Sequence, residues 1–427
     1  MMRRLALLAL LSAAAVAIAD AAEWRFEPVV TLSAQDNSNV LLVDGEPQSD
    51  KVASVAVDLS ASRRTERATV TMSYTPEREQ YQDLSELDNT SHALRLGVNS
   101  QLSQRTAWDA SLSWVRRERS RLSFDDTTQD LVALPRTRYD TMAASLNGNI
   151  EQSPRLRWLW GVAAATTKYD DTAVEFTDPA ANGGSPSDPS ATSAFTLEDS
   201  QDLGVRGGIE HDLSESSRVR GELRINRIDE GARGERDVRR VLGGWTFGRI
   251  ERLQVDISAG AAFSKLRDPG ELTNVTATSA TDTVGSVTVR GTVGARGQLT
   301  AGIGRDVTNT LGVSGASLTD SATIGYLHPI GRFSEFNLGL RYADRTPLDD
   351  NQALARSKTK AYRAEYRAAF NSHWALVVAG EKVDQSSSST RQSSGADPSP
   401  TLDTTPPAID YQIFTLGIRW APLSRGG

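Results

Sequence analysis

Few side chains in this sequence could carry out catalysis. The chain has four histidines, His92, His211, His328 and His373, and no cysteine. A hydrolytic site needs a histidine beside a nucleophile and a third group that orients the histidine, and none of the four is expected to share a cluster in the lumen with a plausible nucleophile. No two histidines have the spacing of metal ligands, and neither a phosphate-binding loop nor a dinucleotide fingerprint occurs. We therefore expect no enzymatic activity, no metal site and no cofactor.

Charged side chains offer a different chemistry, because they recur at alternating positions. Of the 47 basic residues, 6 are Lys and therefore 41 are Arg. Arg keeps its charge and donates hydrogen bonds in a planar fork, which suits anion binding or pairing with carboxylates. We expect one set of charged residues to line a water-filled interior: Arg206, Glu210, Arg220, Glu222, Arg224, Arg240, Asp256, Arg290, Arg341, Arg363, Glu365, Arg367 and Arg419. Such a wall guides anionic or hydroxyl-rich solutes through a pore, or its charges pair and brace it; both interpretations remain open.

The elements that would position these charges are β-strands. Apolar residues alternate with polar ones throughout the chain, and no stretch has the helical period. About 18 segments show this alternation, with 16 also plausible because boundaries are read least well. Their apolar positions span 24–32, 55–59, 68–74, 94–98, 108–114, 142–150, 158–164, 203–209, 219–225, 241–247, 253–263, 287–293, 299–303, 324–326, 336–342, 362–370, 374–378 and 414–420.

The connections between these segments alternate in length. Long loops are expected at 35–51, 76–88, 117–138, 170–198, 229–236, 265–283, 305–315 and 384–407, and short turns lie between them. Short turns on one side and long loops on the other are typical of an antiparallel up-and-down barrel in the bacterial outer membrane, with short periplasmic turns and long extracellular loops. A soluble Greek-key sandwich has no reason to alternate in this way. We therefore predict a single all-β transmembrane barrel over residues 22–420, closed by pairing of the last strand with Trp24–Leu32.

Tryptophans gather near the ends of the predicted strands. We expect Trp108, Trp114, Trp158, Trp160, Trp245, Trp374 and Trp420 to form a lipid-facing girdle. Indole rings favour the membrane interface, where one edge is hydrated and the body of the ring is in an apolar environment. The alternative is that they are ordinary core aromatics, but their spread over many strands favours the girdle.

Composition and the two ends of the sequence limit the class further. Two arginines, a short apolar run and small residues open the chain, which is the layout of a secretory signal peptide, so residues 1–21 are expected to be removed and residues 421–427 to form a periplasmic tail. The hydrophobic fraction of 38% suits an apolar belt around a polar interior better than a dense core. The net charge of −7 argues against nucleic acid as a partner.

A family resemblance follows from these features. The chain has a Trp-containing first strand that ends in Asp36-Asn37-Ser38-Asn39, paired strands of the type SVAVDLSASRRTERATVTMSYTPEREQY, and an aromatic-rich last strand followed by Ala421 to Gly427. In these respects it resembles the β-barrel porins often encoded in exopolysaccharide or exosortase gene clusters. The resemblance implies an outer-membrane conduit that works beside a periplasmic polysaccharide-export protein.

Three functions are compatible with the sequence. The barrel is a diffusion porin for hydrophilic solutes, a conduit for polymer export, or a non-conducting structural or adhesive barrel whose lumen is filled by charge pairs. In each case the expected partners are outer-membrane lipid, lipopolysaccharide and the barrel-assembly machinery.

Overall fold

The computed structural model describes residues 24–42, 47–118, 138–170, 199–229, 234–249, 252–268, 279–309, 316–348, 356–388 and 408–421, together with the backbone of 173–177 and 192–196. The predicted signal peptide at 1–21, and all of the predicted tail at 421–427 except Ala421, lie outside the described residues. In the described part, no helix is both long and apolar enough to cross a membrane.

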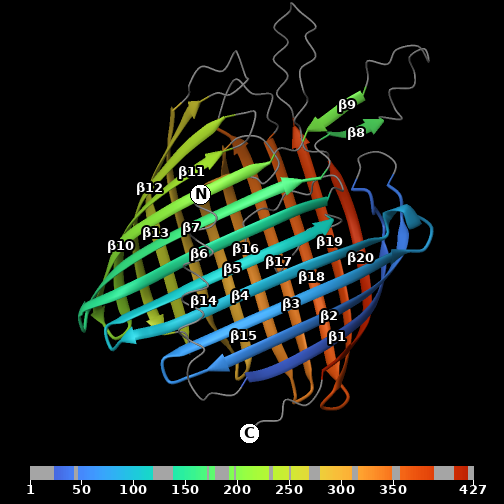
Figure 1. The fold of residues 1–427 in the computed structure, drawn as a ribbon, viewed down its shortest axis with the longest axis horizontal. Helices are drawn as coiled ribbons and strands as arrows, with labels where there is room; N and C mark the ends of the chain where they lie inside the picture. The colour runs from blue at the N-terminus through green and yellow to red at the C-terminus, as the bar shows by residue number, and fades with distance from the viewer. Residues whose placement is uncertain are drawn as a thin grey trace, which may run out of the picture.

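The described chain forms one antiparallel 18-stranded sheet that closes on itself (Figure 1). Each strand pairs with its sequence neighbours, β7 pairs with β10, and β1 pairs with both β2 and β20. The predicted all-β up-and-down barrel is therefore confirmed. Its strands are β1 (Trp24–Asn37), β2 (Asp50–Arg64), β3 (Ala68–Tyr81), β4 (Asn89–Ser103), β5 (Thr106–Glu118), β6 (Arg138–Ser153), β7 (Leu156–Tyr169), β10 (Ser200–Ser214), β11 (Ser217–Asp229), β12 (Glu235–Arg249), β13 (Leu253–Asp268), β14 (Ser279–Val293), β15 (Gly297–Asn309), β16 (Ala316–Ile330), β17 (Ser334–Pro347), β18 (Arg356–Ala369), β19 (Trp374–Ser388) and β20 (Ile409–Trp420).

The strands extend further into the predicted long loops than the apolar pattern indicated. The loop predicted at 265–283 is interrupted by the ends of β13 at Asp268 and β14 at Ser279. Inside the loop predicted at 170–198, β8 (Ala173–Thr177) and β9 (Thr192–Thr196) form a separate two-stranded hairpin. These ends were missed because strands that continue beyond the lipid no longer need an apolar face, so the alternation fades while the backbone pairing continues.

The closing seam differs in register from the prediction. β20 pairs with β1 from Val30↔Trp420 to Asn37↔Ile413, whereas Trp24 to Val29 pair only with β2. The predicted partner segment, Trp24–Leu32, is thus wrong for most of its length. In a barrel the strands are tilted and staggered, so the last strand meets the first one at an offset that sequence alone does not reveal.

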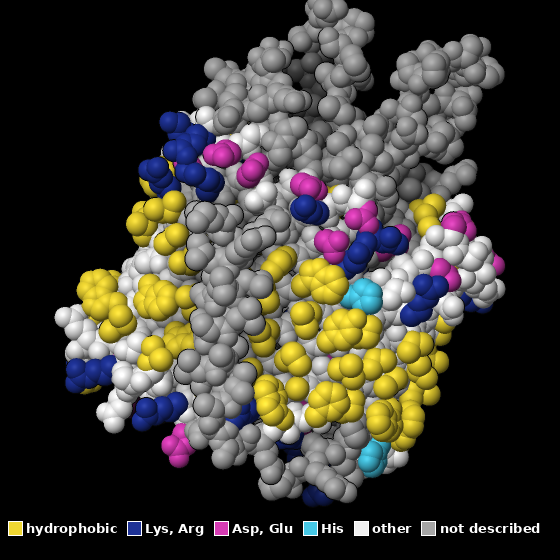
Figure 2. Space-filling model, in the orientation of Figure 1, with side chains coloured by type: hydrophobic (Ala, Val, Ile, Leu, Met, Phe, Trp, Pro, Cys, Tyr) yellow, Lys and Arg dark blue, Asp and Glu magenta, His cyan; other side chains and the backbone are white. Residues whose placement is uncertain are grey.

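Cross-strand partners share a face, so the register sorts the strand residues into an inner and an outer set. The outer set contains the exposed apolar side chains, among them Trp158, Leu203, Ile257 and Leu416. Figure 2 shows hydrophobic side chains gathered over the strands that face the viewer, with charged side chains above them toward the long loops. An exposed apolar surface of this extent marks a membrane-facing belt.

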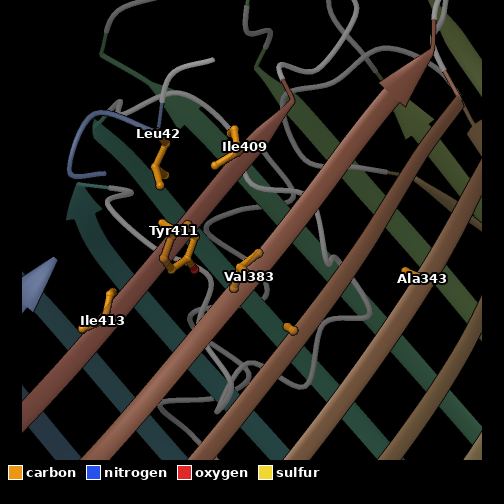
Figure 3. Packing of buried hydrophobic residues seen from close by; sticks show 7 residues of the cluster. Leu42, Ala343, Val383, Ile409, Tyr411 and Ile413 are labelled. Atoms are coloured by element: carbon orange, nitrogen blue, oxygen red, sulfur yellow. The ribbon is translucent and has the colours of Figure 1, made fainter. Parts of the chain in front are cut away.

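Burial is concentrated where the inner face meets the long-loop end. Leu42, from the connection after β1, packs against a cluster on β17 to β20 (Figure 3) that contains Ala343, Ala361, Val383, Ile409, Tyr411 and Ile413. Leu42 has a φ of 56°, which is rare for a branched side chain. The backbone N–H of Ser38 donates to the carbonyl of Gln412, which anchors this connection to β20. The first long loop therefore turns inward at its start.

Candidate functional site

The candidate site is the inner face of the barrel. Strand alternation and register put every charged residue predicted for the interior on the face opposite the apolar belt: Arg206, Glu210, Arg220, Glu222, Arg224, Arg240, Asp256, Arg290, Arg341, Arg363, Glu365, Arg367 and Arg419. They come from β10 to β14 and from β17 to β20, so most of them form two separate groups on the wall.

Three arginines lie in register on neighbouring strands. Arg206 of β10 is directly opposite Arg224 of β11, and Arg224 is directly opposite Arg240 of β12. We call these three residues the arginine row. Like charges directly opposite each other in a sheet are destabilising. Arg224 is paired with Glu222, and the Arg240 Nε lies 2.8 Å from an oxygen of Asp306, whereas Arg206 has no ion pair or hydrogen bond among the described residues.

Below the arginine row, toward the short turns, the charges are paired. Arg157 of β7 donates to Glu210 at 2.9 Å and to Asp212 at 2.6 Å. Arg218 of β11 completes the network, with its Nε 2.6 Å from Asp212 and its Nη1 3.3 Å from Glu210. Arg157 and Asp212 were missed as site residues, although Arg157 stands directly opposite Glu210 in the register. This network braces the wall where β7, β10 and β11 meet.

The second group, on β17 to β20, is also partly paired. Arg363 donates to Glu365 at 2.7 Å, and Arg367 donates to Glu335 of the neighbouring strand at 3.4 Å. The Arg419 Nε is buried without a hydrogen-bond partner among the described residues. The inner face thus combines bracing ion pairs with guanidinium groups that keep donors available.

Two arginines lie flat along the wall over glycines. A Cβ on Gly161 would lie 2.6 Å from the Nε of Arg206, and a Cβ on Gly244 would lie 2.6 Å from the Nε of Arg220. Both distances are too short for real atoms, so a side chain at either glycine would force the arginine away from its present position. Neither Arg220 nor Arg290 has an ion pair or hydrogen bond in the described part of the chain. The Arg220 guanidinium therefore presents free donors without projecting across the lumen, and the Arg290 guanidinium also has free donors.

The wall of β1 to β5 has a different character. A cavity of about 580 Å³ lies against it, and its inner-face lining is Arg25, Glu27, Ser60, Ser62, Thr71, Ser73, Arg95, Ser111 and Ser113. Arg25 is paired with Glu27 at 2.6 Å, but Arg95 has no such partner among the described residues. Hydroxyl groups both donate and accept hydrogen bonds. This wall therefore offers hydroxyls around one free guanidinium, a combination that the sequence analysis did not single out.

The predicted girdle tryptophans all belong to the outer set. Trp108, Trp158, Trp160, Trp245, Trp374 and Trp420 lie near the short turns, whereas Trp114 lies further toward the long loops. The indole N–H of Trp158 donates to Gln152 at 2.8 Å, and that of Trp245 donates to Ser217 at 2.8 Å. Trp114 stacks on His92, which also stacks on Tyr74. The aromatic ring system is therefore denser at the short-turn end.

Three of the four histidines contact a neighbouring hydroxyl group. The Nδ1 of His92 is 2.9 Å from the Tyr74 hydroxyl, that of His328 is 3.1 Å from the Tyr326 hydroxyl, and that of His373 is 3.1 Å from the Ser372 hydroxyl. His92 and His328 belong to the outer set. Within the described residues, no group of three or more His, Cys, Asp or Glu side chains could hold a metal ion.

No family model and no curated protein matches the chain. Similar solved structures include OccK2 (OpdF) of Pseudomonas aeruginosa, with 10% identity over 93% of this chain and 98% of that chain and a TM-score of 0.43. OccAB4 of Acinetobacter baumannii is 9% identical over 94% of this chain and 98% of that chain, with a TM-score of 0.44. The copper transporter OprC is 9% identical over 94% of this chain and 80% of that chain, with a TM-score of 0.45. At this level the likeness says nothing about what this chain transports.

Proposed function

We propose that this chain is an outer-membrane channel for hydrophilic solutes. The observation that carries the proposal is the arginine row, Arg206, Arg224 and Arg240, on the inner face of a closed 18-stranded barrel. A barrel of this circumference leaves an aqueous lumen unless it is plugged. Like charges directly opposite each other reduce the stability of a sheet. Glu222 and Asp306 offset the charges of Arg224 and Arg240, so Arg206 is the member of the row whose charge no partner among the described residues offsets, and recognition of a passing anion accounts for it.

The outer face supports location in an outer membrane. A closed antiparallel barrel satisfies its backbone groups without edges, which is a requirement in lipid. The apolar belt, the tryptophans near the short turns and the long loops at the opposite end correspond to the outer-membrane arrangement. The side with the short turns would then be periplasmic and the side with the long loops extracellular.

The free donors favour solutes that carry a carboxylate or phosphate group. Arg206, Arg220 and Arg290 have unused guanidinium donors, whereas inner-face carboxylates such as Asp256 already accept hydrogen bonds from Thr246 and Gln254. Planar guanidinium groups bind carboxylate and phosphate with two parallel hydrogen bonds. The hydroxyl-lined wall around Arg95 suits the hydroxyl groups of the same solutes. We propose anionic, hydroxyl-bearing small molecules as the preferred solutes.

A non-conducting, braced barrel is the alternative. The network of Arg157, Glu210, Asp212 and Arg218 favours it, because these charges satisfy one another and need no solute. Export of an exopolysaccharide is a narrower version of the channel proposal that rests on the family resemblance. The genes adjacent to this one, and polymer release from a deletion strain, would test it.

Planar-bilayer recording of the purified barrel separates these functions. We expect stable conductance steps and a reversal potential that shows a preference for anions in a salt gradient. Arg206→Gln together with Arg290→Gln should lower this preference, while the outer-face control Arg227→Gln should leave it unchanged. Absence of any conductance from a folded, heat-modifiable barrel would exclude the channel and favour the braced barrel.

Lipopolysaccharide is the proposed partner of the outer face. Three basic residues are exposed at the long-loop end of the belt. Arg239 lies directly opposite exposed Phe263, and Arg227 and Lys265 lie one row further toward the long loops, on either side of Asp237. Arg227 forms an ion pair with Asp237 at 3.3 Å. Phosphate groups of the outer leaflet would lie at that height. Substitution of the three basic residues by Gln should reduce lipopolysaccharide that co-purifies with the barrel. We also propose the barrel-assembly machinery as a partner, since antiparallel outer-membrane barrels need assistance to insert; depletion of that machinery should prevent insertion.

A further inference from the structure

The ladder between β14 and β15 is incomplete. It runs from Val293↔Gly297 to Gly285↔Arg305 and stops there. β14 nevertheless continues to Ser279 and stays paired with β13, and β15 continues to Asn309 and stays paired with β16. At the long-loop end, therefore, the two strands separate.

Beyond this point β15 bends toward the lumen. By alternation Val307 belongs to the outer set with Ile303, which is 63% exposed, but Val307 is only 2% exposed. It packs in a cluster with Ile228, Val238, Ala262 and Val284, all of which belong to the inner set of β11 to β14. Leu318 of β16 packs against the same cluster. The end of the β15–β16 pair thus lies over the inner face of the neighbouring wall.

Arg240 holds this end in place. Its Nε donates to Asp306 at 2.8 Å, another guanidinium nitrogen donates to the carbonyl of Val307, and a third interaction reaches Asn226 at 3.3 Å. In the wall β13 and β14 stand between β12, which carries Arg240, and β15. Direct contact across two intervening strands is possible only because the end of β15 has moved inside the barrel.

We propose that residues 306–309, with Leu318, form a latch that narrows the extracellular half of the lumen, and that Arg240 is the residue that positions it. The latch has a defined alternative position. In the β14–β15 ladder the residue numbers of every pair sum to 590. If the ladder continued in this register, Thr308 would lie opposite Asp282 and Val307 opposite Thr283. In that position the end of β15 rejoins the wall and Val307 faces outward.

Each position of the β15 end is stabilised by interactions that the other position lacks. The inward position buries Val307 and Leu318 and provides the Arg240 hydrogen bonds. The wall position would instead pair backbone groups of β14 between Ser279 and Val284 that now lack a partner strand on the β15 side. Because an edge strand leaves such groups unpaired, loss of the Arg240 contacts should shift the equilibrium toward the wall position.

Disulfide trapping tests the two positions, and the absence of native cysteine makes the background clean. Asp282→Cys with Thr308→Cys places the two cysteines directly opposite each other in the wall position, within the Cα separation of about 7 Å that a disulfide needs. We expect this pair to cross-link slowly when Arg240 is present. Adding Arg240→Ala should raise the cross-linking rate about 10-fold or more, because the loss of charge-assisted hydrogen bonds shifts the two-state equilibrium toward the wall position. Thr292→Cys with Gln298→Cys, a pair within the intact ladder, is the matched control and should cross-link equally fast with or without Arg240.

An equal cross-linking rate with and without Arg240 would overturn the latch. Asp306→Asn is a second, milder variant that should also accelerate cross-linking, and it keeps the test valid if Arg240→Ala folds poorly. The effect on the lumen rests on the proposed channel function: Arg240→Ala should raise the single-channel conductance, and oxidation of the Asp282/Thr308 cysteine pair should hold it at the raised level. Because cross-linking needs no conductance, a barrel that cross-links as expected but never conducts would refute the channel and retain the latch.

Discussion

Replacing Leu416 with Arg places a charge on the outer face of the strand that closes the barrel. Leu416 is 49% exposed and lies opposite Ala34 on one side and Val378 on the other. Trp420, in the short-turn part of the tryptophan girdle, is four positions further along the same strand. Four residues correspond to about 13 Å along a strand and, at a tilt of about 40°, to about 10 Å along the barrel axis. Leu416 therefore lies near the middle of an apolar band about 25 Å tall, where a lipid-facing Arg costs about 2–4 kcal/mol.

The matched control is Thr415→Arg, one residue earlier on the same strand. Thr415 pairs with Gln35 and Ala379 on the inner face, so its arginine would point away from lipid. We expect this control to change the free energy of unfolding by less than about 1 kcal/mol. Urea titration of both variants in lipid vesicles, followed by tryptophan fluorescence, measures the difference, and heat-modifiable migration on gels checks assembly. Equal stability of the two variants would show that Leu416 does not face lipid and would refute the assignment of the two faces.

Three further perturbations test the wall and the loops. Gly244→Leu should push Arg220 off the wall and lower the conductance, and it should destabilise the barrel by about 1–3 kcal/mol through overpacking. Adding Arg220→Ala to this variant should restore the conductance. If the conductance stays low, Arg220 does not lie flat along the wall. Arg157→Gln should leave Glu210 and Asp212 with Arg218 as their remaining shared partner. The free energy of unfolding should fall by less than about 2 kcal/mol because the site is partly hydrated, and an unchanged urea midpoint would argue against bracing. Asp50 is 3% exposed, and its carboxylate accepts hydrogen bonds from backbone N–H groups of the connection after β3. Asp50→Ala should therefore lower the free energy of unfolding by about 1–3 kcal/mol and speed proteolysis at that connection. An unchanged cleavage rate would show that Asp50 does not anchor the connection.

Much of the architecture was predictable because its signals are local. The alternation along each segment identified the strands, and the alternating connection lengths identified the two ends of the barrel. The same alternation sorted Arg206 and Trp158 to opposite faces without knowledge of their neighbours. The hairpin of β8 and β9 escaped prediction because each of its strands, such as Ala173–Thr177, is too short to show a period.

The arrangement of the site was not predictable to the same extent. Arg206, Arg224 and Arg240 were each expected in the interior, but their alignment depends on the register of three strands, which turn geometry and barrel stagger decide together. The pairing of Arg157 with Glu210 and Asp212 depends on the register between β7 and β10, which a long connection separates in the sequence.

The sequence by itself thus determined that this chain is a barrel with an apolar outside and a charged inside, because a period of two is a property of each strand alone. Only the tertiary structure decided which charges are paired, which guanidinium groups lie free over Gly161 and Gly244, and that the connection at Leu42 and the end of β15 at Val307 turn into the lumen. Those outcomes depend on contacts between segments far apart in the chain. Local patterns carry no information about such contacts, since the same alternation would be satisfied with β15 in the wall or inside it.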